Sequence, residues 1–156
     1  MTTTRIAGQN VQIQHENDTL SVELTPRAGE CPGVSYLDIK VSAATPTRPS
    51  PISLVWEQKM VDIHYGAGAQ RHWNLGGMGS RRLKASAASQ APAISMFNYA
   101  GINRLTLAVA DAINTSELII RHAEETGCIT CTLQIFVDPV PPLTGYTTTI
   151  RFDTRE

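Results

Sequence analysis

The stretch Cys128-Ile-Thr-Cys-Thr-Leu-Gln-Ile-Phe-Val137 decides the fold class, because apolar and polar residues alternate along almost its whole length. Successive side chains of an extended strand point to opposite faces. The apolar members of this stretch therefore share one face: Ile129, Cys131, Leu133, Ile135 and Val137. The run Arg104-Leu-Thr-Leu-Ala-Val109 repeats the pattern through Leu105, Leu107 and Val109. Two such runs predict strands that each bury one face in a core.

The alternation continues on both sides of these two runs. Further strands are predicted at 11–15, 19–24, 37–41, 52–56, 61–65, 94–99, 117–122 and 146–152. Inward positions include Leu37, Ile39 and Val41 in one strand, and Ile52, Leu54 and Trp56 in the next. No amphipathic helix of ~10 or more residues is present, although 111–115 is compatible with one helical turn. Nine or ten short strands predict an all-β protein, an antiparallel β-sandwich.

The joins between strands carry turn residues. Glu16-Asn17-Asp18 separates the strands at 11–15 and 19–24, which predicts an opening hairpin. The proline- and glycine-containing segments 26–33 and 45–51 are predicted to be loops. The stretch 66–79 is predicted to be a long irregular loop, because it is rich in glycine.

Length and charge exclude several classes of protein. The chain has 156 residues, of which 42% are hydrophobic and 17% are charged, which is typical of one globular domain. A net charge of -1 argues against a nucleic-acid-binding surface, which needs a concentrated basic face. No run approaches the ~20 apolar residues of a membrane span, and the N-terminus lacks the apolar segment of a signal peptide. We therefore expect a cytoplasmic protein with neither nucleic-acid nor membrane partners.

The cysteines and histidines do not predict a metal site or a cofactor. Cys128 and Cys131 have the spacing of a zinc or redox knuckle, but side chains three apart on a strand point to opposite faces. Cys131 is interpreted as a small buried residue. The histidines show no ligand spacing, although two of them flank the glycine-rich stretch: His15, His64, His72 and His122.

No catalytic residue is predicted from the carboxylates. Four of them are expected near strand ends, but their spacing selects no pair for hydrolysis: Glu57, Asp62, Asp111 and Asp138.

The glycine-rich stretch Tyr65-Gly-Ala-Gly-Ala-Gln-Arg-His-Trp-Asn-Leu-Gly-Gly-Met-Gly79 is the candidate functional segment. Glycine lets backbone approach a partner closely, and Trp and Arg often anchor interfaces. Trp73 beside Arg71 and Asn74 would suit a sugar ring. Alternatively, Trp73 closes the end of the sandwich as a core residue.

Three segments carry a resemblance to a known family. They are Ala-Gly-Ala-Gln-Arg-His-Trp-Asn-Leu-Gly-Gly at 67–77, Ile-Ser-Met-Phe-Asn-Tyr-Ala-Gly-Ile-Asn-Arg-Leu-Thr-Leu-Ala-Val-Ala-Asp-Ala-Ile-Asn at 94–114, and Tyr-Thr-Thr-Thr-Ile-Arg-Phe-Asp-Thr-Arg at 146–155. They are similar to the N-terminal β-sandwich of bacterial α-galactosidases of glycoside hydrolase family 36. The resemblance is strongest from about residue 65 onward and implies a sandwich of the supersandwich, galactose-mutarotase-like type.

The resemblance also implies a function. In that family a (β/α)8 barrel with both catalytic aspartates of a retaining glycosidase follows the sandwich, and a barrel needs roughly 250 further residues. We therefore expect a single, non-catalytic accessory domain at 1–156 that supports a barrel and oligomer assembly. In some members a loop of this domain borders a neighbouring subunit's active site. Candidate sugar or interface contacts are Arg71, His72, Trp73 and Asn74, followed by Trp56 and His64.

Two alternatives stay open at this point. One is a free-standing carbohydrate-binding module that uses Trp73 and Trp56 to bind a galactoside. The other is a small enzyme that uses His64 or His72 with Asp62 or Glu57. A shared fold does not decide among these three functions.

Overall fold

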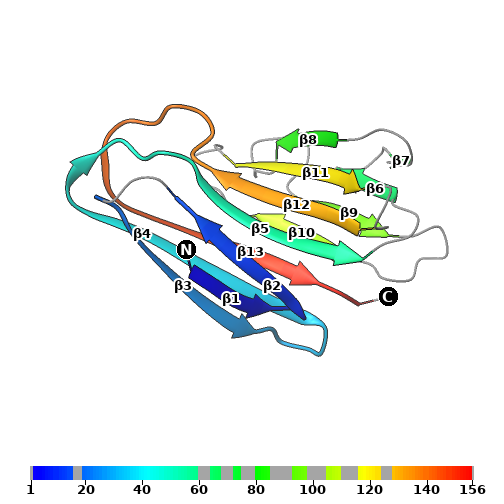
Figure 1. The fold of residues 1–156 in the computed structure, drawn as a ribbon. Coiled ribbons are helices and arrows are strands. Elements are labelled where there is room, and N and C mark those ends of the chain that lie inside the picture. Colours follow the sequence, from blue (N-terminus) through cyan, green and yellow to red (C-terminus); the bar gives the residue numbers. More distant parts are fainter. Residues whose placement is uncertain are drawn as a thin grey trace.

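The computed structural model describes residues 2–15, 19–59, 64–67, 72–74, 80–84, 93–97, 105–109, 116–123 and 128–155. All regular structure in these ranges is β-strand (Figure 1). The strands are β1 (Thr2–Ile6), β2 (Gln9–Gln14), β3 (Ser21–Ala28), β4 (Val34–Thr47), β5 (Ile52–Lys59), β6 (His64–Ala67), β7 (His72–Asn74), β8 (Ser80–Lys84), β9 (Ala93–Phe97), β10 (Leu105–Val109), β11 (Glu117–Ala123), β12 (Cys128–Ile135) and β13 (Leu143–Asp153). The predicted all-β class is confirmed.

The described strands form two antiparallel sheets. The six-stranded sheet has the order β1-β2-β5-β12-β11-β8, and the seven-stranded sheet has the order β3-β4-β13-β10-β9-β6-β7. Side chains of β5 and β13 meet between the sheets, since the rings of Trp56 and Phe152 lie 5.9 Å apart in an edge-to-face contact. The architecture is therefore a β-sandwich, as the alternation predicts.

The core consists of the inward positions that the alternation identifies. Buried apolar side chains of the seven-stranded sheet include Leu37, Ile39, Val41, Leu105, Leu107, Val109, Ile150 and Phe152. Those of the six-stranded sheet include Val11, Ile13, Ile52, Leu54, Trp56, Cys131, Leu133 and Ile135. A period of two thus predicts which face of each strand is buried.

Phe136 departs from this pattern. β12 ends at Ile135, and Phe136 adopts φ 62° yet is buried, with its ring 4.9 Å from that of Tyr146. A left-handed conformation is unfavourable for an aromatic residue, so packing must outweigh its cost. Val137 lies beyond the strand end and is only half-buried.

The predicted opening hairpin is wrong. β2 pairs with β1 and β5, whereas β3 pairs with β4 in the other sheet. The actual opening hairpin joins β1 to β2 through Ala7 and Gly8, which have φ 49° and 78°. Two successive positive φ values are typical of the tight turns that join antiparallel strands. Alternation identifies the buried face of a strand, but it does not identify the strand's partner.

Two predicted loops are shorter than expected. β3 continues through Pro26 to Ala28, and β4 continues through Pro46 to Thr47. β3 lies at an edge of its sheet, and the pairing of β13 with β4 is irregular between Leu143 and Gly145. Edges and irregularities are the places where a strand tolerates a residue without an N–H. The predicted helical turn at 111–115 lies outside the described residues.

No helix in the described part of the chain is long and apolar enough to cross a membrane.

The turn between β1 and β2 predicts a stabilising substitution. Ala7→Asn should raise the free energy of unfolding by about 0.5 kcal/mol, since Asn tolerates positive φ better and Asn-Gly favours this turn. Gly8→Ala should lower it by about 1 kcal/mol. Urea denaturation followed by circular dichroism measures both. A Gly8→Ala variant as stable as the unchanged protein would contradict the assigned turn geometry.

Candidate functional site

Part of the predicted glycine-rich loop is a β-hairpin. β6 and β7 pair so that His64 lies opposite Asn74, Tyr65 opposite Trp73, and Gly66 opposite His72. β6 also pairs with β9, which leaves β7 at the edge of the seven-stranded sheet. The prediction of one irregular loop over 66–79 is therefore wrong for residues 66–67 and 72–74. Glycine content misled it, because Trp73 suits a strand and pairing with a neighbouring strand holds the short segment extended.

The hairpin brings most of the predicted contact residues onto two neighbouring strands. The backbones of His64, His72, Trp73 and Asn74 lie within one three-residue ladder. Arg71 lies outside the described residues. The ladder places His72 opposite Gly66, two pairs from the His64–Asn74 pair.

Trp56 is not a surface contact. Its side chain is only 2% exposed and packs against Phe152 in the core. Its indole N–H has no hydrogen-bond acceptor among the described residues. The prediction of a sugar or interface contact at Trp56 is therefore wrong. The strand pattern contained the correct signal, since Trp56 shares an inward face with Ile52 and Leu54.

The structure describes Cys131 and two of the four predicted carboxylates. Cys131 is buried among apolar side chains, which raises the pKa of its thiol to about 12. Glu57 and Asp138 are exposed, whereas Asp62 and Asp111 lie outside the described residues. The described His, Cys, Asp and Glu residues include no group of three that could hold a metal ion.

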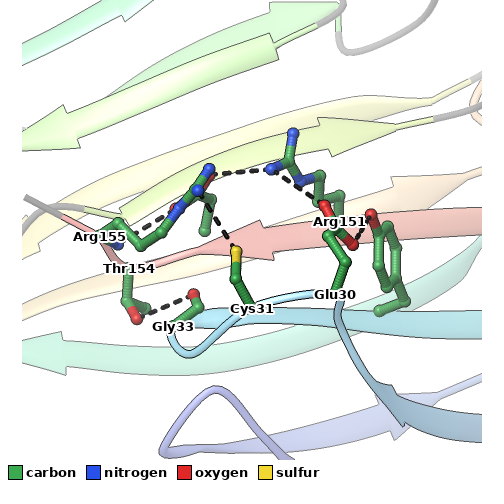
Figure 2. Close-up of polar contacts among 8 residues, drawn as sticks. Glu30, Cys31, Gly33, Arg151, Thr154 and Arg155 are labelled. Carbon is green, nitrogen blue, oxygen red and sulfur yellow. Dashed lines mark hydrogen bonds and ion pairs between the residues drawn. The ribbon is translucent and has the colours of Figure 1, made fainter.

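Within the described ranges, a connected group of polar side chains lies where β13 ends against the turn between β3 and β4. We call it the exit cluster; it comprises Glu30, Cys31, Tyr36, Arg151, Asp153 and Arg155. Figure 2 shows Glu30, Cys31, Arg151 and Arg155 within it. At its centre the Asp153 carboxylate is almost fully buried, with 5% exposure of the residue. A buried carboxylate requires charged partners, and here arginines from both sides supply them.

Arg155 binds Asp153 through two nitrogens. Its Nε donates to Oδ1 at 2.9 Å and its Nη2 donates to Oδ2 at 2.6 Å, while its backbone N–H donates to Oδ1 at 3.1 Å. Arg151 adds a fourth contact, from Nη2 to Oδ2 at 3.1 Å. The hydrogen bonds from Arg155 are the main reason that the pKa of Asp153 falls to about 2.

The cluster continues across the strands to the turn. Arg151 Nη2 lies 3.8 Å from Glu30 Oε1, and Tyr36 donates its hydroxyl to Glu30 Oε2 at 2.9 Å. The pKa of the Glu30 carboxyl is lowered mainly by a hydrogen bond between that carboxyl and the backbone of Glu30. The hydrogen bond from the Tyr36 hydroxyl is the second cause. Arg155 Nη1 also donates to Cys31 Sγ at 3.3 Å. Charge and hydrogen bonds therefore link the turn to the end of β13 through side chains.

Backbone contacts fasten the same two segments. The N–H of Thr154 donates to the carbonyl of Gly33 at 2.8 Å, and the Thr154 hydroxyl donates to the same oxygen at 3.1 Å. Gly33 has φ 85°, a conformation that favours glycine. A side chain at position 33 would also meet Arg155 Cγ at 2.9 Å. Close approach at Gly33 therefore depends on the absence of a side chain.

Sequence reasoning missed the exit cluster. Its available signal is the alternation of charge in Arg151, Asp153 and Arg155, which places all three on one face of an extended segment. Nothing in that spacing indicates that Glu30 and Cys31, more than 100 residues earlier, lie opposite.

Comparison with known proteins supports the architecture. No protein-family model and no curated protein matches the sequence. The solved structure of the Slr1438 protein from Synechocystis sp. PCC 6803 is similar over 99% of this chain and 65% of that protein, with a TM-score of 0.51 and 8% identity. The HI1317 structure is similar over 97% of this chain and 62% of that protein, with a TM-score of 0.48 and 8% identity. This chain thus spans less than two thirds of the length of either structure, and the first likeness shows the fold alone.

The exit cluster predicts a pH-dependent contribution to stability. The pKa of Asp153 is lower in the folded state, about 2, than the value of about 3.9 in an unfolded chain. Its contribution is therefore complete above about pH 5 and is lost as the pH falls through 2. Asp153→Asn should lower the free energy of unfolding at pH 7 by roughly 1–2 kcal/mol, since both arginine partners are partly exposed.

Urea denaturation between pH 2 and 7 measures this effect. The curve for Asp153→Asn should be flatter than that of the unchanged protein in the acidic range. Glu23→Gln, which removes an exposed carboxylate on β3 outside the exit cluster, is the matched control and should change stability by a few tenths of a kcal/mol. Parallel pH curves for Asp153→Asn and the unchanged protein would contradict the proposed role of the carboxylate.

The buried position of Trp56 predicts a structural effect. Trp56→Ala should lower the free energy of unfolding by about 3–5 kcal/mol because it leaves a cavity beside Phe152. Val55→Ala, at the half-buried neighbour on the outer face, should cost less than about 1.5 kcal/mol. Thermal or urea denaturation distinguishes the two. Undiminished stability in Trp56→Ala would mean that the indole does not belong to the core.

Proposed function

We propose that this chain is the non-catalytic sandwich domain of a glycosidase similar to the α-galactosidases of glycoside hydrolase family 36. Two observations support the proposal. The segments 67–77, 94–114 and 146–155 resemble the N-terminal domain of that family, and the fold is a β-sandwich. The domain would support a catalytic barrel and a homo-oligomer in the cytoplasm.

The exit cluster is the structural feature that carries the proposal furthest. β13 lies between β4 and β10 in the interior of the seven-stranded sheet. Its end is then held by Asp153, Thr154 and Arg155 against the turn at Gly33. The resembling strand in the family leads directly into the barrel. A fastened end gives a following domain a defined starting point and direction, which suits a support.

The chemistry of the exit cluster also fits a supporting role. Glycosidases use two carboxylates that act on the sugar from opposite sides of the scissile bond. Asp153 and Glu30 instead face arginine or tyrosine partners within this cluster. We therefore assign them to structure, and the proposal places the catalytic pair on the barrel.

Trp56 and Glu57 do not fit their predicted roles in the two alternative functions. A carbohydrate-binding module cannot stack a sugar on Trp56, because that ring is buried, so Trp73 is the platform left to that alternative. A small enzyme would pair His64 or His72 with Glu57 or with Asp62, which lies outside the described residues. His64 and His72 belong to the seven-stranded sheet, while Glu57 is exposed on the six-stranded sheet.

The proposal predicts the size of the native protein. An antibody raised against residues 1–156 should detect, in a denatured lysate of the source cells, a band several times larger than 17.0 kDa. Native size separation of that lysate should give a multiple of the denatured mass, and the same fraction should cleave an aryl α-galactoside. The purified 1–156 chain should show no such cleavage.

A denatured band at 17 kDa would contradict the proposal, as would galactosidase activity of the purified 1–156 chain. Lysate of cells that lack the corresponding gene is the control for antibody specificity.

A further inference from the structure

The outer faces of the two sheets differ in chemistry. On the seven-stranded sheet the polar side chains bind one another: Arg27 is paired with Asp38 and lies over the ring of Tyr36, and Thr149 donates to Asp38 at 2.7 Å. The outward positions of β2, β5 and β12 in the six-stranded sheet carry mostly amides and hydroxyls, namely Asn10, Gln12, Gln14, Ser53, Thr130, Thr132 and Gln134. These outward positions are therefore mostly polar and uncharged. The charged side chains beside them are Glu57 on β5, Arg5 on β1 next to Asn10, and Arg121 on β11 next to Thr130.

A pocket of about 430 Å³ opens on this amide- and hydroxyl-rich face. Its lining includes Gln9, Asn10 and Gln12 from β2, Val55, Trp56 and Glu57 from β5, and Thr130 from β12. The Trp56 side chain itself points into the core and is buried. Gln12 lies opposite Val55 and Glu57 lies opposite Thr130 in the strand register. The volume falls within the range of small-molecule sites, and paired strands hold its lining groups in place.

The polar side chains of this pocket are not used by the fold. Among the described residues, no hydrogen bond or ion pair engages the side chains of Asn10, Gln12 or Glu57, although Gln134 donates to Ser53 on the same face at 3.1 Å. Asn10, Gln12 and Glu57 are exposed, so their donors and acceptors are accessible to a ligand. Gly8, in the turn with Ala7, also lines the pocket, and the positive φ values of the turn bend the backbone sharply there.

We propose that this pocket binds a neutral saccharide through adjacent hydroxyl groups. Amide side chains both donate and accept hydrogen bonds, a carboxylate accepts two, and a threonine hydroxyl does either. Neighbouring sugar hydroxyls match this mixture. A ligand carboxylate placed against Glu57 is disfavoured, because Glu57 is the charged group in the lining and has the same sign. Exposed Arg5 and Arg121 lie on the flanking strands, outside the lining. The site goes beyond the proposed supporting function, and it does not depend on a barrel.

The ligand pair D-galactose and D-galacturonate tests the chemistry of the pocket. In calorimetric titrations of the purified chain, D-galactose or raffinose should bind in the millimolar range, since no aromatic side chain is exposed in the pocket. D-galacturonate, which differs from galactose by a carboxylate, should bind at least about tenfold more weakly. Backbone amide shifts in nuclear magnetic resonance spectra should change at residues 8–12, 55–57 and 130.

Two substitutions and a matched control test the residues. Gln12→Ala and Glu57→Gln should each weaken galactose binding by about tenfold, which is the effect of losing one or two hydrogen bonds. Gln14→Ala removes the next outward amide on β2, beyond the pocket, and should leave affinity within about twofold. Circular dichroism checks that each variant is folded. If a variant does not fold, the chemical-shift changes of the unchanged protein still show whether galactose binds in the pocket.

The proposal would be overturned by any of three results. These are no saccharide binding at millimolar concentrations, equal loss in Gln14→Ala and Gln12→Ala, or shift changes confined to the β6–β7 hairpin. Each is distinguishable from failure of the proposed function, because that function is judged by the size and activity of the protein in the source lysate.

Discussion

The pairing of β13 with β4 is the interaction on which the rest of the structure depends. Its register runs from Gly145–Ser42 to Asp153–Val34, so one long ladder joins the last strand to an early one. On the inward face it places Ile150 and Phe152 beside Leu37, with Trp56 packed across from the other sheet. On the outward face the same register places Arg151 opposite Tyr36, and both residues belong to the exit cluster. Core and cluster are thus two sides of one ladder.

In the exit cluster, the unfavourable burial of the Asp153 carboxylate is offset by the arginines beside it. Asp153 would be unfavourable at 5% exposure without the guanidinium groups of Arg151 and Arg155. Both arginines remain partly exposed, so their own desolvation is limited. Removing the carboxylate leaves two solvated cations, whereas removing an arginine leaves a buried anion with fewer partners. The carboxylate is therefore the part that depends most strongly on its neighbours.

The sequence predicted the strands and their buried faces because a period of two is a local property. Leu105, Leu107 and Val109, and equally Cys131, Leu133 and Ile135, are all buried as expected. Partners are not local, so the hairpin of 11–15 with 19–24 was wrong. Because of Pro26 and Pro46, β3 and β4 were predicted to end earlier than they do. A strand tolerates proline at an edge or an irregular pairing, and the sequence alone does not show where these lie. The exit cluster was missed for the same reason, since Glu30 and Asp153 meet only after the sheet forms.

The interior position of β13 has a consequence for synthesis on the ribosome. β4 and β10, on its two sides, leave the exit tunnel long before residues 143–153 do, and they cannot pair through β13 until then. The seven-stranded sheet is therefore completed late, and its apolar inner face stays exposed until β13 pairs with β4 and β10. Folding that depends on pairing between strands far apart in the sequence is slow, and it leaves hydrophobic surface exposed until that pairing forms. A nascent chain stalled before residue 143 should thus be a natural substrate for chaperones that bind exposed apolar segments.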